Sequence, residues 1–198
     1  MCVILYATPG ARITKDEIRK AAKTNPDGNG YITIDVKGVT HFAKGVTTND
    51  VIRAFNRAGN DSARIFHARI ATSGGINRDM CHPFVSFTGQ FLLMHNGIIH
   101  DALYKGTDKE SDTQQLAYDI DYFMGIGRAS LDRLASDNAS RFLVVDRDTG
   151  SVDLFGDWSY EAGIFRSNKH HLYTQPEYTQ PRRAGFTEWP FQKYQFTY

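Results

Sequence analysis

Short apolar runs, separated by turn-forming segments, predict more strands than helices along this chain. Val3 to Ala7 is apolar throughout and predicts a buried strand, whereas Tyr31 to Val36 alternates between apolar and polar positions, as half-buried strands do. Runs of the same kind predict further strands at 39–43, 63–71, 84–88, 91–95, 141–146, 151–155 and 161–166.

Helical spacing of apolar positions appears in four stretches, at 14–23, 48–57, 112–123 and 129–136. Thr14 occupies the cap position of the first stretch, and Glu17, three residues on, is the expected partner in a capping box. Arg147 to Gly150 separates two strands and predicts a hairpin. Strands, then a pair of helices, then strands again are typical of an α+β fold with largely antiparallel sheets.

The segment from Asn25 to Gly30 (NPDGNG) is a dense turn signal. Its Gly28-Asn29-Gly30 lacks the third glycine of a dinucleotide-binding loop and precedes a strand, whereas such a loop opens a helix. The segment therefore offers no support for a nucleotide cofactor, and we expect no cofactor of any other kind.

Composition places the chain among ordinary globular proteins. Its 198 residues are 41% hydrophobic and 23% charged, and we expect a single domain over residues 1–198 with an aromatic tail at about 174–198 that covers the surface or contacts a partner. The formal net charge of +1 offers no electrostatic reason to expect nucleic acid or an anionic membrane as a partner. The apolar runs are also far shorter than the ~18 residues that a membrane span needs.

The amino terminus and the cysteines indicate a cytoplasmic protein. The first residues lack the basic start and the apolar stretch of roughly 7–15 residues that a secretory signal needs. The two cysteines, Cys2 and Cys81, do not have the spacing of a metal site, so we expect no bound metal. We expect both thiols to be reduced, because disulfides persist mainly in oxidising compartments, and Cys81 to be a packed thiol.

Cys2 is the first candidate for chemistry. Removal of Met1 would leave a residue that carries both a thiol and a free α-amine. Because a thiol has a pKa near ~8.5 and an α-amine near ~7.7–8.0, the amine can act as the base for the adjacent nucleophile. The plain alternative is that Cys2 is a small buried hydrophobic residue in a strand.

Three further segments carry polar groups at the ends of predicted elements. Arg69 near a strand end offers a planar fork that pairs with a carboxylate, and Asn96 beside Gly97 offers a side-chain amide and a backbone N–H as oxyanion donors. Asp112 places a carboxylate at a helix start. The plain alternatives are a surface ion pair for Arg69, a hairpin turn for Asn96-Gly97 and a helix cap for Asp112.

In this order the segments resemble the glutaminase domain of class II glutamine amidotransferases, which are N-terminal-nucleophile hydrolases. The resemblance covers roughly residues 1–175. It is carried by Met1-Cys2, Arg69 to Gly74 (RIATSG), Cys81 to Phe84 (CHPF), His95-Asn96-Gly97 and Ser111-Asp112-Thr113, with looser similarity at 25–30, 156–158 and 163–168.

The resemblance implies a four-layer αββα sandwich with the active site at strand ends between two sheets. It also implies that Cys2 attacks the side-chain amide of glutamine, giving a thioester and ammonia, with its own α-amine as base. Asn96 and the N–H of Gly97 would then form the oxyanion hole. Substrate binding would fall to Arg69 at the α-carboxylate, Asp112 at the α-amine and Thr72 beside them.

The chain also departs from the family pattern. Ile70 and Ser73 stand where the sugar-aminating members carry Trp and His, which affects the loop that covers glutamine. His82 fits the family, and we expect it to be structural. Synthetase members continue into an acceptor domain, for which no residues remain here, so we expect a stand-alone form that passes ammonia to a separate acceptor or synthetase subunit or hydrolyses an amide outright.

Two alternatives to glutamine hydrolysis stay open from the sequence. The same nucleophile could act on another γ-glutamyl or small amide. A catalytically inactive binding protein of the same fold could instead use its aromatic tail, and retention of Met1 would favour it.

Overall fold

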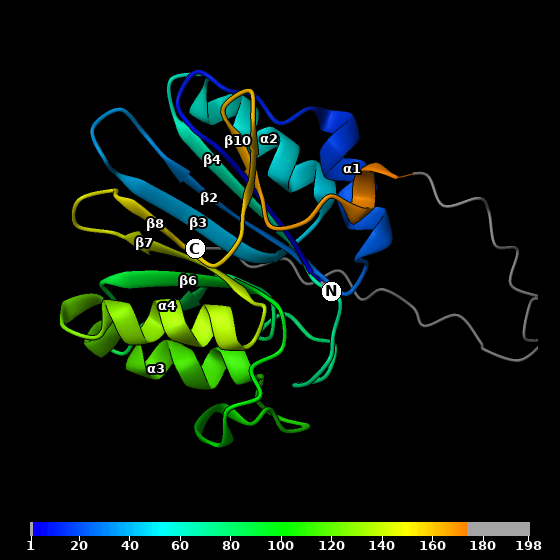
Figure 1. Ribbon diagram of the computed structural model, residues 1–198. Coiled ribbons are helices and arrows are strands. Elements are labelled where there is room, and N and C mark those ends of the chain that lie inside the picture. The colour runs from blue at the N-terminus through cyan, green and yellow to red at the C-terminus, as the bar shows by residue number, and fades with distance from the viewer. Residues whose placement is uncertain (1, 174–198) are drawn as a thin grey trace, which may run out of the picture.

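The computed structural model describes residues 2–173, so Met1 and the predicted aromatic tail at 174–198 lie outside the described residues. Within this range, one sheet has six strands in the order β3-β2-β4-β1-β10-β9 and the other has four in the order β5-β6-β7-β8, and all the paired neighbours are antiparallel (Figure 1). The strands are β1 (Val3–Ala7), β2 (Asn29–Ile34), β3 (Thr40–Val46), β4 (Ala63–Ala68), β5 (Phe84–Val85), β6 (Phe91–Asn96), β7 (Arg141–Asp146), β8 (Val152–Phe155), β9 (Ser159–Glu161) and β10 (Ile164–Arg166).

Helices cover the outer face of each sheet. They are α1 (Lys15–Thr24), α2 (Thr48–Ala58), α3 (Asp112–Gly125) and α4 (Arg128–Asp137), with short 3₁₀ turns η1 (Ala102–Tyr104) and η2 (His170–Leu172). In Figure 1, α1 and α2 lie over the six-stranded sheet, and α3 and α4 lie under the four-stranded sheet. The predicted α+β fold with a four-layer αββα sandwich is therefore confirmed.

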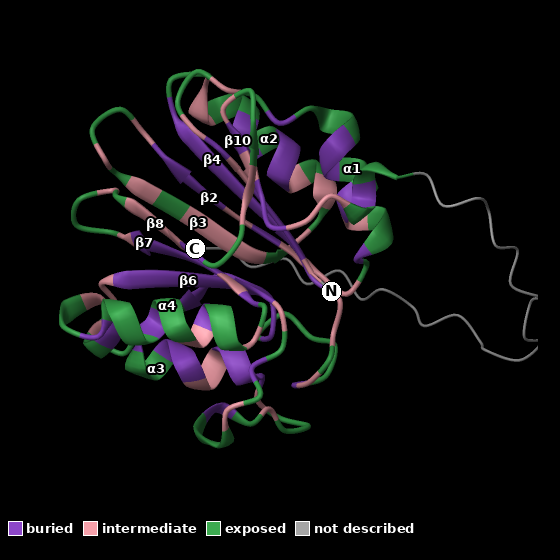
Figure 2. Ribbon diagram, in the orientation of Figure 1, coloured by how far each residue is buried: buried purple, intermediate pink, exposed green. Residues whose placement is uncertain are grey.

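Three apolar clusters hold the four layers together. One joins α1 and α2 to the six-stranded sheet, a second lies between the two sheets, and a third joins α3 and α4 to the four-stranded sheet. Figure 2 shows the consequence, since the central strands are buried while each helix is exposed on its outer side. Strands that are covered on both faces need apolar residues at nearly every position, which explains the unbroken runs in the sequence.

The two faces of β1 belong to different clusters. Val3, Leu5 and Ala7 pack toward the helices, whereas Ile4 packs between the sheets. Successive side chains of a strand point to opposite faces, so Cys2 lies on the same side as Ile4. The start of the chain is thereby aimed into the space between the sheets.

The structure corrects four local predictions. The predicted strand 161–166 is two strands, β9 and β10, joined at Ala162 and Gly163, whose positive φ values of 49° and 77° make a tight hairpin loop. The strands predicted at 63–71 and 84–88 end early, at Ala68 and Val85, where turns begin. Thr14 does cap α1, but Glu17 contributes only its backbone N–H there, because its carboxylate binds Arg166 and His171 instead.

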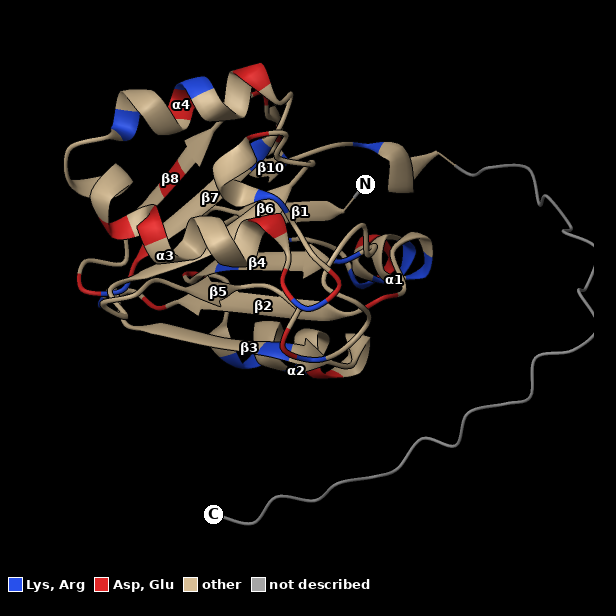
Figure 3. Ribbon diagram, turned by 90° about the horizontal axis from the view of Figure 1, so that it is seen from below, with Lys and Arg blue, Asp and Glu red and all other residues tan. Residues whose placement is uncertain are grey.

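Charges of both signs are interspersed over the described part of the chain. Figure 3 shows that α1 and α4 each carry both Lys or Arg and Asp or Glu, while the strands carry few charges. Among residues 2–173, no helix combines the length and the apolar character needed to cross a bilayer.

Candidate active site

A small cavity at the ends of β1, β4 and β6 brings together most of the residues singled out from the sequence. It encloses about 20 Å³ and is lined by Cys2, Arg69, Ile70, Thr72, Ser73, His82, His95, Gly97, Ser111, Asp112 and Thr113. Five of the six predicted site residues are in this lining. This volume is close to that of one water molecule, so the polar groups lie close together around little free space.

Cys2 lies directly before β1, held on both sides by neighbouring segments. Its thiol donates to the carbonyl of Ile70 at 3.6 Å, and its own carbonyl accepts from the side-chain amide of Asn168 at 2.7 Å. Burial raises the pKa of the Cys2 thiol, while the bond to Ile70 and the charge of Arg69 oppose that rise. A thiol with a raised pKa is mostly protonated at neutral pH, so nucleophilic attack would require a base.

Arg69 follows β4 and is buried, with an exposed fraction of 3%. Its two terminal nitrogens donate to the carbonyls of Ser73 and Gly75 at 2.7 and 2.8 Å, so the guanidinium shapes the loop that closes the cavity. No ion pair of Arg69 occurs within residues 2–173, so the alternative of a surface ion pair is wrong for this part of the chain. A buried cation with no acidic partner is well suited to receive an anionic group.

Asn96 is the last residue of β6, so the alternative of a hairpin turn at Asn96-Gly97 is wrong. Its side chain is fully buried and does not line the cavity. The amide nitrogen donates to the hydroxyl of Ser167 at 2.9 Å, and the amide oxygen has no hydrogen-bond partner among residues 2–173. Gly97 has a φ of 154° and lies so close to Ser140 that any Cβ would collide with its hydroxyl. Only glycine fits at this point.

Asp112 is the first residue of α3, and Ser111 before it is the cap, which corrects the alternative of Asp112 as the cap. Its carboxylate is buried and accepts backbone N–H groups from Ile99 at 2.8 Å and Thr113 at 2.7 Å. Thr72 lies on the exposed side of the cavity lining.

Sequence reasoning assigned no catalytic or binding role to the histidines beside the cavity. His82 and His95 line it, and the ring of His82 stacks on that of His67 with centroids 4.0 Å apart. Burial lowers the pKa of His67 to about 3 and that of His95 to about 4, and it holds the pKa of His82 well below its usual range. These imidazoles are therefore neutral at physiological pH. Their signal in the sequence was the position of His82 and His95 inside recognised motifs.

The turn at residues 25–30 packs against two parts of the cavity lining, the segment that begins at Arg69 and the backbone of His82. The N–H and carbonyl of Arg69 bond to Gly28 and Asp27, and the Asp27 carboxylate accepts the N–H of Ala71 at 2.8 Å. Gly30 lies against the His82 backbone, where a Cβ would overlap the carbonyl oxygen. Gly30 thus permits close packing beside the site.

Comparisons with known proteins point in the same direction. A 47-residue segment is 45% identical to the glutamine–fructose-6-phosphate aminotransferase (isomerizing) of Streptococcus pyogenes serotype M3, which is 24% of this chain and 8% of that protein. A 75-residue segment is 33% identical to the enzyme of the same name from Geobacillus kaustophilus, covering 38% of this chain and 12% of that protein. The matched segments therefore span a small part of these relatives.

Among solved structures, glutamine phosphoribosylpyrophosphate amidotransferase from B. subtilis, complexed with ADP and GMP, is similar with a TM-score of 0.55 and 19% identity. The match covers 87% of this chain and 43% of that one, and at this identity it shows the shared fold. No family model matches the chain. The resemblance to class II glutamine amidotransferase domains is confirmed at the level of the fold and of short sequence segments.

Proposed function

We propose that this chain hydrolyses the side-chain amide of glutamine through a thioester on Cys2 and releases ammonia. The observation that carries the proposal is the gathering of a thiol, a buried guanidinium, a buried carboxylate and the Gly97 backbone around one cavity. A thiol supplies the nucleophile, and opposite charges suit the two ends of an amino acid.

Acylation begins after removal of Met1. The free α-amine of Cys2 takes the thiol proton, and the sulfur attacks the side-chain carbonyl carbon of glutamine. Asn96 and the N–H of Gly97 stabilise the oxyanion that forms. As the carbonyl is restored, the C–N bond breaks, the protonated amine returns its proton to the leaving nitrogen, and ammonia departs.

Deacylation uses the same groups. The α-amine takes a proton from a water molecule, whose oxygen attacks the thioester carbon. The C–S bond then breaks, the thiolate regains its proton from the amine, and glutamate leaves. The raised pKa of the Cys2 thiol supports the acylation half of this scheme, because a protonated thiol needs a base before its sulfur can attack.

Substrate recognition is assigned to Arg69 at the α-carboxylate and Asp112 at the α-ammonium, with Thr72 at the rim. A volume of about 20 Å³ does not hold a glutamine, so the loop of residues 72–76 must move outward for binding. The hydrogen bonds from Arg69 to Ser73 and Gly75 would then give way in part to bonds with the substrate carboxylate.

We also propose that the ammonia goes to a separate acceptor or synthetase subunit, and that the reaction takes place in the cytoplasm, where Cys2 would stay reduced. Copurification of an enzyme that consumes ammonia, together with glutamine-dependent activity of the mixture, would support the first of these proposals.

Intact-mass measurement combined with an ammonia-release assay tests the central proposal. We expect a mature chain that starts at Cys2 and releases ammonia from glutamine faster than from a panel of other γ-glutamyl and small amides. Faster release of ammonia from another amide would identify that amide as the substrate, with the same Cys2 mechanism. A chain that retains Met1 and releases no ammonia would favour the inactive binding protein.

A further inference from the structure

The segment from Arg166 to His171 crosses the end of β1 and touches both the nucleophile and the oxyanion amide. Its residues form hydrogen bonds to Cys2, Ile4 and Asn96, which are far from it in the sequence. Sequence reasoning noted a loose similarity here but assigned no role to any of these residues.

Ser167 uses its hydroxyl as a shared acceptor. The oxygen accepts the N–H of Ile4 at 2.8 Å and the side-chain amide of Asn96 at 2.9 Å, and the Ser167 N–H donates to the Ile4 carbonyl at 3.0 Å. Since the Asn96 amide oxygen has no partner in the described part of the chain, this is the contact that sets the orientation of the amide there. The second amide hydrogen of Asn96 is left for an oxyanion.

Asn168 holds the nucleophile residue from the opposite side to Ile70. Its amide nitrogen donates to the Cys2 carbonyl at 2.7 Å, while its amide oxygen accepts the N–H of His170 at 3.1 Å. The residue is therefore tied at both ends of its side chain. Cys2 lies before the first regular strand pairing, so this bond replaces a missing ladder contact.

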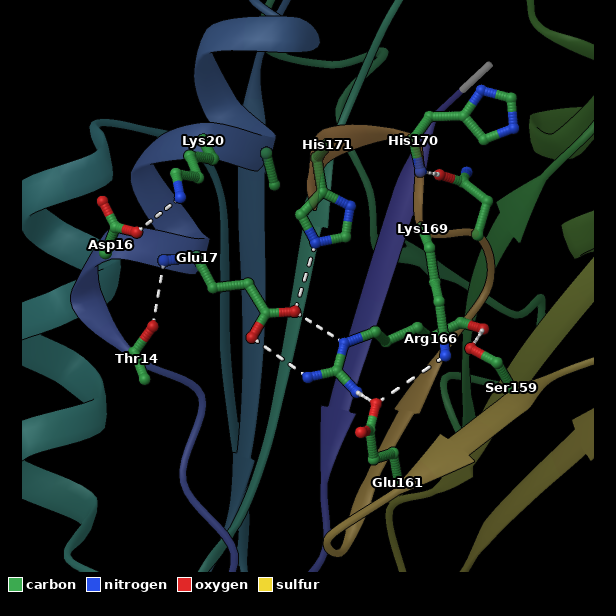
Figure 4. A network of polar contacts seen from close by, with 12 residues as sticks. Thr14, Asp16, Glu17, Lys20, Ser159, Glu161, Arg166, Lys169, His170 and His171 are labelled. Atoms are coloured by element: carbon green, nitrogen blue, oxygen red, sulfur yellow. Dashed lines mark hydrogen bonds and ion pairs between the residues drawn. The ribbon is translucent and has the colours of Figure 1, made fainter. Parts of the chain in front are cut away.

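Glu17 on α1 anchors the segment at both of its ends. Arg166 donates to the Glu17 carboxylate at 2.7 and 3.2 Å, and His171 contacts the same carboxylate at 3.1 Å. Figure 4 shows the two side chains converging on Glu17 from different directions. All three residues are buried, so removing Glu17 or Arg166 would leave the other with an uncompensated buried charge.

We propose that Ser167 and Asn168 are positioning residues, Ser167 for the oxyanion amide of Asn96 and Asn168 for Cys2, held in place by the Glu17 anchor. The proposal rests on the proposed function, because it deepens the account of the same site. A misplacement of about 1 Å can cost on the order of 100-fold in rate, so small shifts of these groups matter.

Kinetics of matched variants provide the first test. Ser167→Ala should lower kcat for glutamine about 10-fold to 100-fold and leave KM within about twofold. Ser86→Ala is the control, because Ser86 is also buried and accepts a backbone N–H, that of Phe91 at 3.1 Å, away from the site. It should leave both constants unchanged. An Ser167→Ala enzyme as active as the control would overturn the proposal.

Double variants that contain Asn96→Ala distinguish the role of Ser167 from that of Asn168. Ser167→Ala should cause no further loss of kcat in that background, because Ser167 acts through Asn96. Asn168→Asp keeps the acceptor for His170 but loses the donor to Cys2, and its loss of about 10-fold should multiply with that of Asn96→Ala. A multiplied loss for Ser167→Ala, or none for Asn168→Asp, would contradict the assignment.

A measurement without substrate keeps the inference independent of the proposed reaction. Hydrogen exchange of the Asn96 side-chain amide, assigned by its disappearance in Asn96→Asp, should be about 10-fold faster in Ser167→Ala than in the wild type or in Ser86→Ala. Equal exchange in all three would overturn the role of Ser167. A wild type that exchanges as expected but does not hydrolyse glutamine would reject the proposed function alone.

Discussion

The carboxylate of Asp112 accepts the backbone N–H of Ile99 at 2.8 Å, which fixes the loop that follows Gly97. The group proposed to bind the substrate ammonium therefore also holds the backbone two residues beyond Gly97. Under the proposed mechanism, loss of this carboxylate would disturb both ammonium recognition and the oxyanion hole.

Cys2→Ala is expected to abolish turnover of glutamine and to leave the fold intact. The thiol makes one long hydrogen bond, to Ile70 at 3.6 Å, so its loss should cost little stability, whereas no other group of the cavity can form the thioester. Cys2→Ser should retain the geometry and lose most of the rate, because a hydroxyl is far less acidic than a thiol. Ammonia release and thermal unfolding check these outcomes, and full activity in Cys2→Ala would reject the mechanism.

Asn96→Ala is expected to lower kcat by about 10²–10³-fold with a smaller change in KM, the usual effect of deleting one preorganised oxyanion donor. Steady-state kinetics with glutamine provide the measurement. If KM alone changed, Asn96 would contact the ground state and the assigned role would be wrong.

Arg69→Lys is expected to weaken glutamine binding although it keeps the charge. Lysine cannot form the bidentate fork, and it also cannot hold the carbonyls of Ser73 and Gly75 at the same time. The loss should be on the order of 1.5–3 kcal/mol, as for a charge-assisted hydrogen bond, and should appear mainly as a higher KM. An unchanged KM would show that Arg69 shapes the loop without binding substrate.

Asp112→Asn is expected to lower kcat/KM for glutamine more than for glutaramic acid, which lacks the α-ammonium. Loosening of the loop at Ile99 would affect both substrates, so the ratio of their kcat/KM values isolates the ammonium contact. The wild type should be poor with glutaramic acid. A wild type that hydrolyses glutaramic acid or a peptide-linked glutamine as well as free glutamine would favour a general amide hydrolase over a glutaminase.

Acid should destabilise the protein in two steps. The pKa values of His67 and His95 are lowered by burial to about 3 and about 4, so the folded protein keeps these rings neutral while the unfolded chain protonates them near pH ~6.5. The unfolded state binds more protons in this window. The free energy of unfolding should therefore fall by about 1.4 kcal/mol per pH unit for each such histidine as pH drops from about 6.5 toward 4.

Protonation of Glu17 lowers the free energy of unfolding at lower pH than protonation of the histidines does. Burial would raise the pKa of its carboxyl, but hydrogen bonds from His171 and Arg166 lower it to about 2, so its contribution is present above its ordinary pKa of 4.5 and is lost as pH falls toward 2. Urea unfolding from pH 7 to about 2 checks both steps. His67→Gln should flatten the upper slope by about 1.4 kcal/mol per pH unit, and an unchanged slope would mean that His67 is not a buried neutral ring.

The sequence pattern alone predicted the α+β class and most of the strands, and the resemblance to a known family implied the order of the layers. Both faces of β1 and β6 are covered, so side chains at successive positions of these strands pack against apolar partners. Unbroken apolar runs such as Val3 to Ala7 indicate this arrangement in the sequence. The candidate chemistry was also predicted, because the thiol, the guanidinium and the amide stand in a series of short motifs whose order resembles one family, although each group taken singly has an ordinary structural explanation.

Only the tertiary structure decided which polar groups meet. Glu17 carries the local signature of a capping box, yet a buried guanidinium on β10 and the imidazole of His171 bind its carboxylate, and no local pattern encodes a partner 149 residues away. For the same reason Ser167 and Asn168 were not foreseen, since their partners Asn96 and Cys2 lie 71 and 166 residues away. Local periodicity reports the face that a residue presents, and long-range hydrogen bonds form only once the sheets have packed.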